Sequence, residues 1–335
     1  MTQPPRAVQL FALDGHGRSR EADLQDFAAS AAIAGTSQGT KGFSFAWVYG
    51  GAGQETTKLE LAPFDLDGFV SDALTAEETR PRCTVHNDGV ILNLRGVNLN
   101  EGADPEDMIS VRLWIQDTVI IGVWKRKLKA IDDLFDAMQR GKAPETPGDF
   151  AAKLSLRLSD RAEPIVAALN DAIDTLEEDL SEGGKLQDAR MRLAQLRHSA
   201  TTLRRYMFPQ RDALTTLEIE DVSWLQERDR SRLREAADRV TRMAEELEAI
   251  RDRAQIVQDQ IMDRRAETMN SQMLLLSIVA AIFLPLGLLT GLLGVNVGGI
   301  PLADSAWGFA IVCAILIVVG IGQVWLFKRL GMFGK

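Results

Sequence analysis

The stretch MLLLSIVAAIFLPLGLLTGLL occupies residues 273–293 of the 335-residue chain. No charged residue occurs anywhere between Thr268 and Ala303. The hydrocarbon core of a bilayer is about 30 Å thick and needs roughly 20 apolar residues of helix. A buried helix of a soluble protein usually keeps a polar stripe, and this stretch has none. We therefore predict a first membrane-spanning helix at about 273–293.

A second uncharged stretch follows close behind. FAIVCAILIVVGIGQVWLF, residues 309–327, also meets the length needed to cross a bilayer. The last part of the chain, 271–335, is therefore predicted to be a two-span membrane domain. Its outer loop would cover about 294–308 and its tail 328–335.

The positive charges around the spans predict their orientation. Arg264 and Arg265 precede the first span, Lys328 and Arg329 follow the second, and the loop between the spans has no Lys or Arg. Loops rich in Lys and Arg stay on the cytoplasmic side. The residues before Gln9 contain no apolar segment of the kind found in signal peptides. We expect a multi-pass protein of the inner membrane with both termini in the cytoplasm.

The first part of the chain, residues 1–148, has the mixed pattern of an α+β cytoplasmic domain. Apolar and β-branched runs predict strands at Val8–Leu13, Phe43–Tyr49, Val90–Leu94, Ser110–Trp114 and Val119–Trp124. Helical patterns occur at Asp23–Ile33, Leu66–Leu74 and Leu128–Met138. Asn87-Asp88-Gly89 predicts a hairpin turn. The sequence has no phosphate-binding glycine loop, nucleophile elbow or metalloprotease motif, so we expect no enzymatic activity.

A linker at Gly141–Gly148 leads into a helical stalk region, predicted at 149–270. Amphipathic helices are expected over Phe150–Leu180 and Lys185–Phe208, the second ended by Pro209. Between Pro209 and Pro285 there is no further proline, and no glycine occurs from Lys185 to Leu286. A single helix can therefore run from Ser231 to the end of the first span.

This long helix carries two stripes at helical spacing. Apolar residues at alternating intervals of three and four predict a packing seam, formed by Leu233, Ala237, Val240, Ala244, Leu247, Ile250, Ala254, Val257 and Ile261. The second stripe begins with Asp252, Asp259 and Asp263. It continues through polar, small and apolar residues, Asn270, Met273, Leu276, Ser277, Ala280, Leu284, Gly287 and Gly291. A solvated helix face explains the aspartates alone equally well. The continuation as small residues inside a span favours helices that converge around a pore.

Few other residues suggest metal chemistry. Cys83 and His86 form a C-x-x-H, half of a possible zinc site, although one Cys and one His are more often unligated. Cys313 lies in the second span, so the chain has no disulfide scaffold. The formal charge of −9 argues against nucleic acid as a partner.

The end of the first span carries the motif Gly294-Val295-Asn296. Its asparagine comes eleven residues after Pro285. A Gly-x-Asn after the first of two C-terminal spans resembles the CorA superfamily, in which Gly-Met-Asn is usual. The stretches Leu92–Asn98, Met108–Trp114 and Tyr206–Leu214 resemble its zinc-transporting ZntB branch. Valine at the middle of the motif departs from the CorA pattern and fits that branch better.

The resemblance implies a CorA-like homopentameric funnel. Five Asn296 carbonyls would form an outer selectivity filter with Gly294 and Val295, and would bind a hydrated dication through its waters. Asn270 would form a second polar ring. Met273, Leu276, Ala280 and Leu284 would form an apolar constriction between the two rings. Asp259 lies where family members carry an aspartate ring facing the cytosol, and is a second candidate for metal contact.

The implied function is transport of Zn²⁺, with Mg²⁺, Co²⁺, Ni²⁺ and Cd²⁺ as further candidate ions. No cofactor is expected, and the implied partners are identical subunits, membrane lipid, divalent cations and protons. The outer loop has Gly299-Ile300-Pro301-Leu302 in place of the acidic Met-Pro-Glu-Leu typical of magnesium-transporting CorA.

Two alternatives remain: a magnesium or cobalt channel of the CorA type, and a two-span scaffold or sensor without transport. A mere anchor needs no polar ring at the end of a span, which separates the last alternative from the others. We expect uptake, coupled to or helped by the proton gradient. A negative membrane potential draws cations inward by about 2.3 kcal/mol per charge per 100 mV, and the sequence has no ATP-binding motif to drive export.

Overall fold

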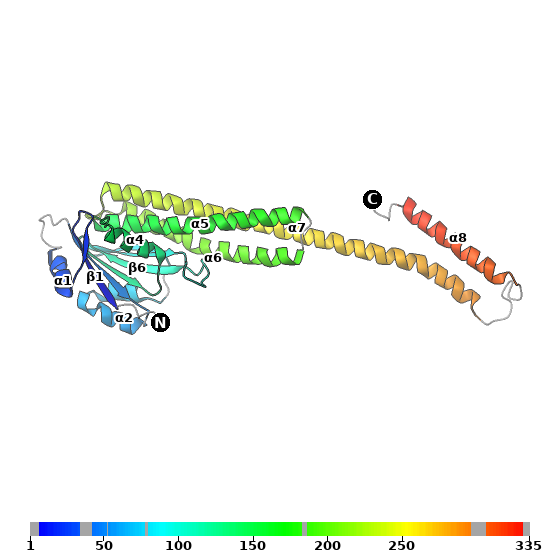
Figure 1. The fold of residues 1–335 in the computed structure, drawn as a ribbon, viewed down its shortest axis with the longest axis horizontal. Helices are drawn as coiled ribbons and strands as arrows, with labels where there is room; N and C mark the ends of the chain where they lie inside the picture. The colour runs from blue at the N-terminus through cyan, green and yellow to red at the C-terminus, as the bar shows by residue number, and fades with distance from the viewer. Residues whose placement is uncertain are drawn as a thin grey trace. The chain divides into compact units, whose positions relative to one another are not determined.

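The computed structural model describes residues 7–33, 42–51, 53–77, 80–182, 186–295 and 306–330. The chain divides into two compact units, Met1–Val257 and Gln258–Lys335. The boundary lies inside one helix, α7 (Glu227–Leu293), which is 67 residues long (Figure 1). The predicted passage of one helix from the stalk region into the first span is therefore confirmed.

The first unit is built on a mixed seven-stranded sheet. Its strands are β1 (Val8–Leu13), β2 (Ser19–Glu21), β3 (Phe43–Tyr49), β4 (Arg82–His86), β5 (Gly89–Gly96), β6 (Ile109–Ile115) and β7 (Val119–Trp124), in the spatial order β2-β1-β3-β7-β6-β5-β4. Only β3 and β7 are parallel. The predicted hairpin turn joins β4 to β5, where Asn87 adopts a φ of 48° and His86 pairs with Gly89.

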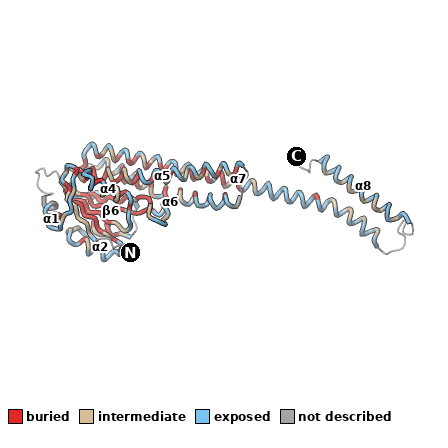
Figure 2. The backbone as a smooth tube through the Cα atoms, viewed as in Figure 1, coloured by how far each residue is buried: buried red, intermediate tan, exposed pale blue. Residues whose placement is uncertain are grey.

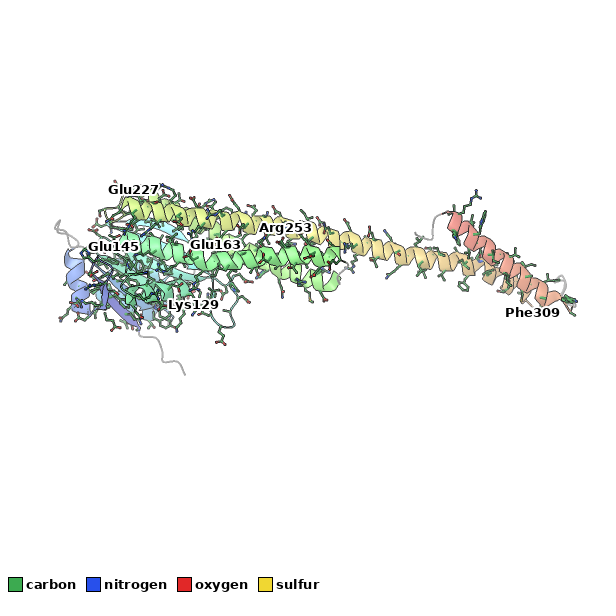
Figure 3. The ribbon with its side chains drawn as sticks, turned by 45° about the horizontal axis from the view of Figure 1, so that its top comes forward. Lys129, Glu145, Glu163, Glu227, Arg253 and Phe309 are labelled. Atoms are coloured by element: carbon green, nitrogen blue, oxygen red, sulfur yellow. The ribbon has the colours of Figure 1, made fainter. Side chains whose placement is uncertain are left out.

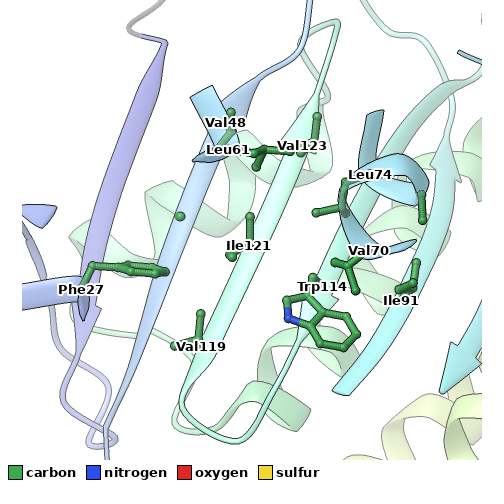
Figure 4. Packing of buried hydrophobic residues seen from close by; sticks show 12 residues of the cluster. Phe27, Val48, Leu61, Val70, Leu74, Ile91, Trp114, Val119, Ile121 and Val123 are labelled. Carbon is green, nitrogen blue, oxygen red and sulfur yellow. The ribbon is translucent and has the colours of Figure 1, made fainter. Parts of the chain in front are cut away.

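One face of the sheet is covered by short helices. They are α1 (Leu24–Ile33), α2 (Gln54–Leu61), the 3-10 turn η1 (Ala62–Phe64) and α3 (Gly68–Thr75). Alternate residues of β3 and β7 point toward them, because successive side chains of a strand face opposite sides. Val48 and Val123 pack there with Leu61, Leu74 and Trp114 (Figure 4). This cluster forms one half of the core.

The other face carries the intervening side chains of β3 and two further helices, α4 (Lys129–Gln139) and α5 (Pro147–Ser181). The Phe45 ring packs at a tilt against Phe150 of α5, with ring centroids 4.7 Å apart, and its centroid lies 6.2 Å from that of Phe135 of α4. Helix α5 begins inside the predicted linker, since Thr146 accepts a hydrogen bond from the Asp149 backbone N–H and Pro147 occupies the first turn.

Three long helices complete this unit: α5, α6 (Leu186–Ile219) and the first part of α7. The predicted seam of α7 is buried along its whole length, from Leu233 at 0% exposure to Ile261 at 5%. Ion pairs at its side reinforce this packing, since Arg253 bonds to Asp174 and Glu177 of α5 (Figure 3). The seam was thus predicted correctly from its spacing.

The prediction that Pro209 ends its helix is wrong, because α6 continues through it to Ile219. The turn after the proline is held by tertiary contacts. Gln210 is buried and its Oε1 accepts a hydrogen bond from the Arg95 backbone N–H of β5 at 2.7 Å, while Leu214 and Leu217 are buried beyond it. Burial of this extra apolar turn outweighs the hydrogen bond that proline removes.

The second unit contains the later part of α7 and helix α8 (Gly308–Arg329). Both helices are long and apolar enough to cross a membrane. Their side chains are mostly exposed within the single chain (Figure 2). A side-chain hydrogen bond joins them, from Gln323 Nε2 of α8 to the Ala281 carbonyl oxygen of α7 at 3.5 Å.

Candidate functional site

The predicted pore-lining residues all lie on the later part of α7, and the chain leaves them uncovered. Asn270, Ser277, Ala280, Gly287 and Gly291 are exposed. The large apolar members are exposed too: 57% of Met273, 70% of Leu276 and 72% of Leu284. Exposed apolar surface of this extent belongs in contact with lipid or with another protein chain.

Two hydroxyl groups in this region donate hydrogen bonds to backbone carbonyl oxygens of their own helix. Ser277 Oγ donates to the Met273 carbonyl oxygen at 2.8 Å, and Thr290 Oγ1 donates to the Leu286 carbonyl oxygen at 3.0 Å. Each oxygen is then left with lone pairs directed away from its donor bond. A ring of such oxygens presents acceptors to a cation or to its water shell.

The glycines of the stripe are not required by packing inside the chain. A Cβ added at Gly287 or at Gly291 would meet no atom within 4 Å. Both glycines also lie in a helix interior, where glycine is unfavourable by roughly 1 kcal/mol relative to alanine. A close approach by another helix is the usual reason for small residues inside a membrane span.

The proposed filter is only partly described. Gly294 closes the last turn of α7, with its N–H donating to the Thr290 carbonyl oxygen at 2.9 Å, and Val295 is half exposed. Asn296 lies outside the described residues, so its role as the outer filter stays a prediction.

The three aspartates of the acidic stripe are exposed, but their surroundings differ. Asp252 pairs with Arg251 of its own helix at 2.8 Å, which partly neutralises its charge. Asp259 and Asp263 belong to the second unit, closer in sequence to the span. Among the described residues of this single chain, no group of three or more His, Cys, Asp and Glu side chains could hold a metal ion.

The structure does not bring Cys83 and His86 together as a metal site. They stand three residues apart on β4, so their side chains leave opposite faces of the strand. Cys83 lines a shallow cavity with Phe208 and Pro209, and burial raises the pKa of its thiol to about 12. His86 Nε2 instead bonds to Asp67 Oδ2 at 2.8 Å on the other face. The structure therefore separates the two residues, in agreement with the expectation that such a pair is more often unligated.

Among the buried ionisable groups of the first unit that sequence reasoning missed, two have a shifted pKa. Arg112 is 1% exposed, and burial lowers the pKa of its guanidinium to about 10. Asp229, near the start of α7, is fully buried, and burial raises the pKa of its carboxyl group. Both residues are charged residues in ordinary amphipathic patterns, so nothing in the sequence distinguishes them from solvent-facing neighbours.

Comparison with known proteins places the chain in a family. Residues 44–329 match the family described as "CorA-like Mg2+ transporter protein". The divalent cation transporter CmaX of Pseudomonas aeruginosa is 39% identical over 266 residues, covering 79% of this chain and 80% of CmaX. The zinc transport protein ZntB of Pectobacterium carotovorum is 38% identical over 260 residues, covering 78% and 79% of the two chains.

Comparison with solved structures agrees with this family assignment. The full-length CmaX protein superposes with a TM-score of 0.78 at 34% identity, covering 98% of this chain and 99% of CmaX. The CorA magnesium transporter of Methanocaldococcus jannaschii reaches the same TM-score, 0.78, at 18% identity, covering 96% and 97% of the two chains, which shows a shared fold. The resemblance predicted from the sequence is confirmed, and the chain belongs to the CorA-like family of divalent-cation transporters, whose members are not enzymes.

Proposed function

We propose that this chain is a zinc transporter of the inner membrane, working as a ring of five identical subunits. The observation that carries the proposal is the uncovered stripe on the later part of α7. It is exposed, small at Gly287 and Gly291, and lined with hydroxyl oxygen at Ser277. Five copies of this stripe around an axis would make a narrow pore with acidic residues at its cytoplasmic end.

Zinc is the proposed cargo because relatives at 36–38% identity are named zinc transport proteins. The chemistry of the predicted filter agrees with a hydrated dication. The Asn296 carbonyls would contact the ion through its waters, and without carboxylates at the outer mouth the ion would not be trapped. Such a filter would admit Mg²⁺ as well, so magnesium or cobalt transport is the second candidate. The family's description names Mg²⁺, which favours magnesium within this candidate.

The proposed direction is uptake. Membrane potential, negative inside, draws cations through an open pore, at about 2.3 kcal/mol per charge per 100 mV. A proton gradient that is acidic outside would help this uptake. Arg264 and Arg265 before the first span, with Lys328 and Arg329 after the second, support cytoplasmic termini.

The function is tested with the full-length chain in proteoliposomes that enclose a zinc-sensitive dye. Zinc entry should exceed that of protein-free liposomes, rise when the interior is made negative, and rise again with an acidic exterior. Magnesium added in excess should compete weakly. Absence of zinc entry under all these gradients would remove the proposal, and strong competition by magnesium would favour the second candidate.

The assembly is tested separately by native mass spectrometry in mild detergent. One pair of spans cannot enclose a hydrated ion, so the proposal requires a ring, five by family resemblance. A spectrum dominated by monomer or dimer would contradict it.

A further inference from the structure

Pro285 leaves one carbonyl of the first span without its helical donor. In an α-helix the N–H of residue i bonds to the carbonyl of residue i−4, and proline has no N–H to give. The carbonyl left over is that of Ala281, inside the apolar stretch of α7. Water is absent from the hydrocarbon core, so an unpaired carbonyl there costs far more than it would at a soluble surface.

The donor comes from the second span. Gln323 Nε2 of α8 lies 3.5 Å from the Ala281 carbonyl oxygen, although the two residues are 42 positions apart in sequence. Gln323 carries the one carboxamide in the second span, which is otherwise apolar from Gly308 to Phe327. Its Oε1 is shielded from solvent and has no hydrogen-bond partner among the described residues. The side chain therefore makes its single hydrogen bond at the position that proline vacates.

We propose that Gln323 is a positioning residue that clasps the proline site of the pore helix to the outer helix. The clasp is the hydrogen bond from Gln323 to the Ala281 carbonyl. Pro285 lies between Leu284 and Gly287 of the predicted lining, so a change of helix direction at this proline would move those residues in the pore. Proline is a common cause of helix kinks, and a fixed partner for the freed carbonyl would limit how far such a kink varies.

The clasp predicts an unusual dependence between two positions. Replacing Gln323 with Leu removes the donor and leaves the Ala281 carbonyl without a hydrogen-bond partner. Replacing Pro285 with Ala restores a backbone N–H, so the Ala281 carbonyl regains its helical partner and Gln323 is no longer needed. In the Pro285→Ala background, Gln323→Leu even removes a carboxamide left without any partner. Its effect should therefore shrink to nothing or change sign.

The test is a double-mutant cycle of wild type, Gln323→Leu, Pro285→Ala and the double variant, all as full-length protein. The first measurement is the thermal unfolding midpoint in detergent, which needs no transport. We expect Gln323→Leu to lower it by about 2–4 °C in the wild-type background and to leave it equal or higher in the Pro285→Ala background. Gln272→Leu is the matched control, because Gln272 is an exposed carboxamide of α7 without a role in the clasp. Its effect should be the same in both backgrounds.

The second measurement is zinc flux at equal amounts of assembled protein, and this part rests on the proposed transport function. Gln323→Leu should lower flux about three- to ten-fold, and the double variant should match Pro285→Ala. Should Gln323→Leu fail to assemble, the double variant should still assemble. Additive effects in the unfolding midpoints would overturn the clasp, whatever the flux. Coupling in the midpoints with no zinc flux from wild type would keep the clasp and reject the transport proposal.

Discussion

The two stretches of α7, Glu227–Val257 and Gln258–Leu293, both carry apolar residues at helical spacing, but these residues have opposite surroundings. Between Glu227 and Val257 the apolar residues of the seam are buried, and Val240, Leu247 and Ile250 are each at 0% exposure. Between Gln258 and Leu293 they are mostly exposed, as at Leu288, where the exposed fraction is 63%. Figure 2 shows the change in burial along the helix.

The difference separates what the chain does alone from what it needs others for. The first stretch packs against α5 and α6, so its seam forms part of a finished core. The second stretch exposes most of its large apolar side chains, which a soluble monomer does not tolerate at this scale. Lipid and neighbouring subunits are the surroundings that fit a helix of this length and composition.

The largest effect should come from the buried stretch. Leu247→Ala should lower the free energy of unfolding of the first unit by about 2–5 kcal/mol, because the cavity it leaves cannot be filled by solvent. Leu288→Ala removes the same atoms from the exposed stretch and should cost far less in detergent. Circular dichroism during chemical unfolding measures both. Equal losses in the two variants would show that the stretches do not differ as described.

A smaller effect should come from the acidic residues before the span. In Asp259→Asn, zinc flux at low ionic strength should fall about two- to five-fold, since the ring would no longer attract the exiting cation. Wild-type flux should fall as salt screens the field, with a Debye length of about 10 Å at 0.1 M, and the variant should respond less.

Asp252→Asn provides the matched control for that measurement. Asp252 lies seven positions further from the span in sequence than Asp259 and belongs to the first unit, so its removal should change flux and salt response less. Flux and salt response at wild-type level in Asp259→Asn would exclude this residue from conduction.

The smallest effect concerns pH and the buried start of α7. The pKa of Asp229 is raised, mainly because the carboxyl group is buried and also because the negative charge of Asp149 is nearby. Hydrogen bonds from Gln226 and Thr146 lower the pKa, but they do not cancel this increase. In the unfolded chain the pKa of this carboxyl group is near 3.8. Because its pKa is higher in the folded state, the group contributes its full stabilisation below pH 3.8. This contribution is lost as pH rises through the pKa of the folded state.

Comparing wild type with Asp229→Asn isolates that contribution. The stability of wild type relative to the variant should decrease from about pH 4 upward. Glu227→Gln, at an exposed position two residues earlier, should leave the pH profile parallel to that of wild type. If the stability of wild type relative to Asp229→Asn increased with pH, the assigned burial would be contradicted.

Regular patterns in the sequence predicted much of the fold. The bounds of β1, β3 and β7 agree with the predictions residue for residue, because these strands are apolar and limited by turn residues. The strand β2 and the helix α2 were not predicted. The strand β2 has only three residues, Ser19–Glu21, and the helix α2 buries only Thr57 and Leu61. Neither element therefore shows a periodic pattern of apolar residues in the sequence.

The candidate site was predictable to a similar extent. The stripe of α7 follows from helical spacing and the chain leaves it exposed, while its role as a pore lining stays a prediction. The Gln323–Ala281 bond could not be predicted, because it depends on the register of two helices joined by a loop. A lone carboxamide in one span and a proline in the other were the available signals. The separation of Cys83 from His86 follows from strand alternation and could have been predicted.

Zinc flux through Asn296→Ala tests the central claim most directly. That claim is that identical α7 helices line a cation pore with a ring of asparagines as its outer selectivity filter. The variant and wild type are reconstituted at equal amounts of assembled protein, checked by size exclusion. The account predicts dye-reported zinc entry in wild type, and entry at the level of protein-free liposomes in the variant. Zinc entry at the wild-type rate in Asn296→Ala would contradict it.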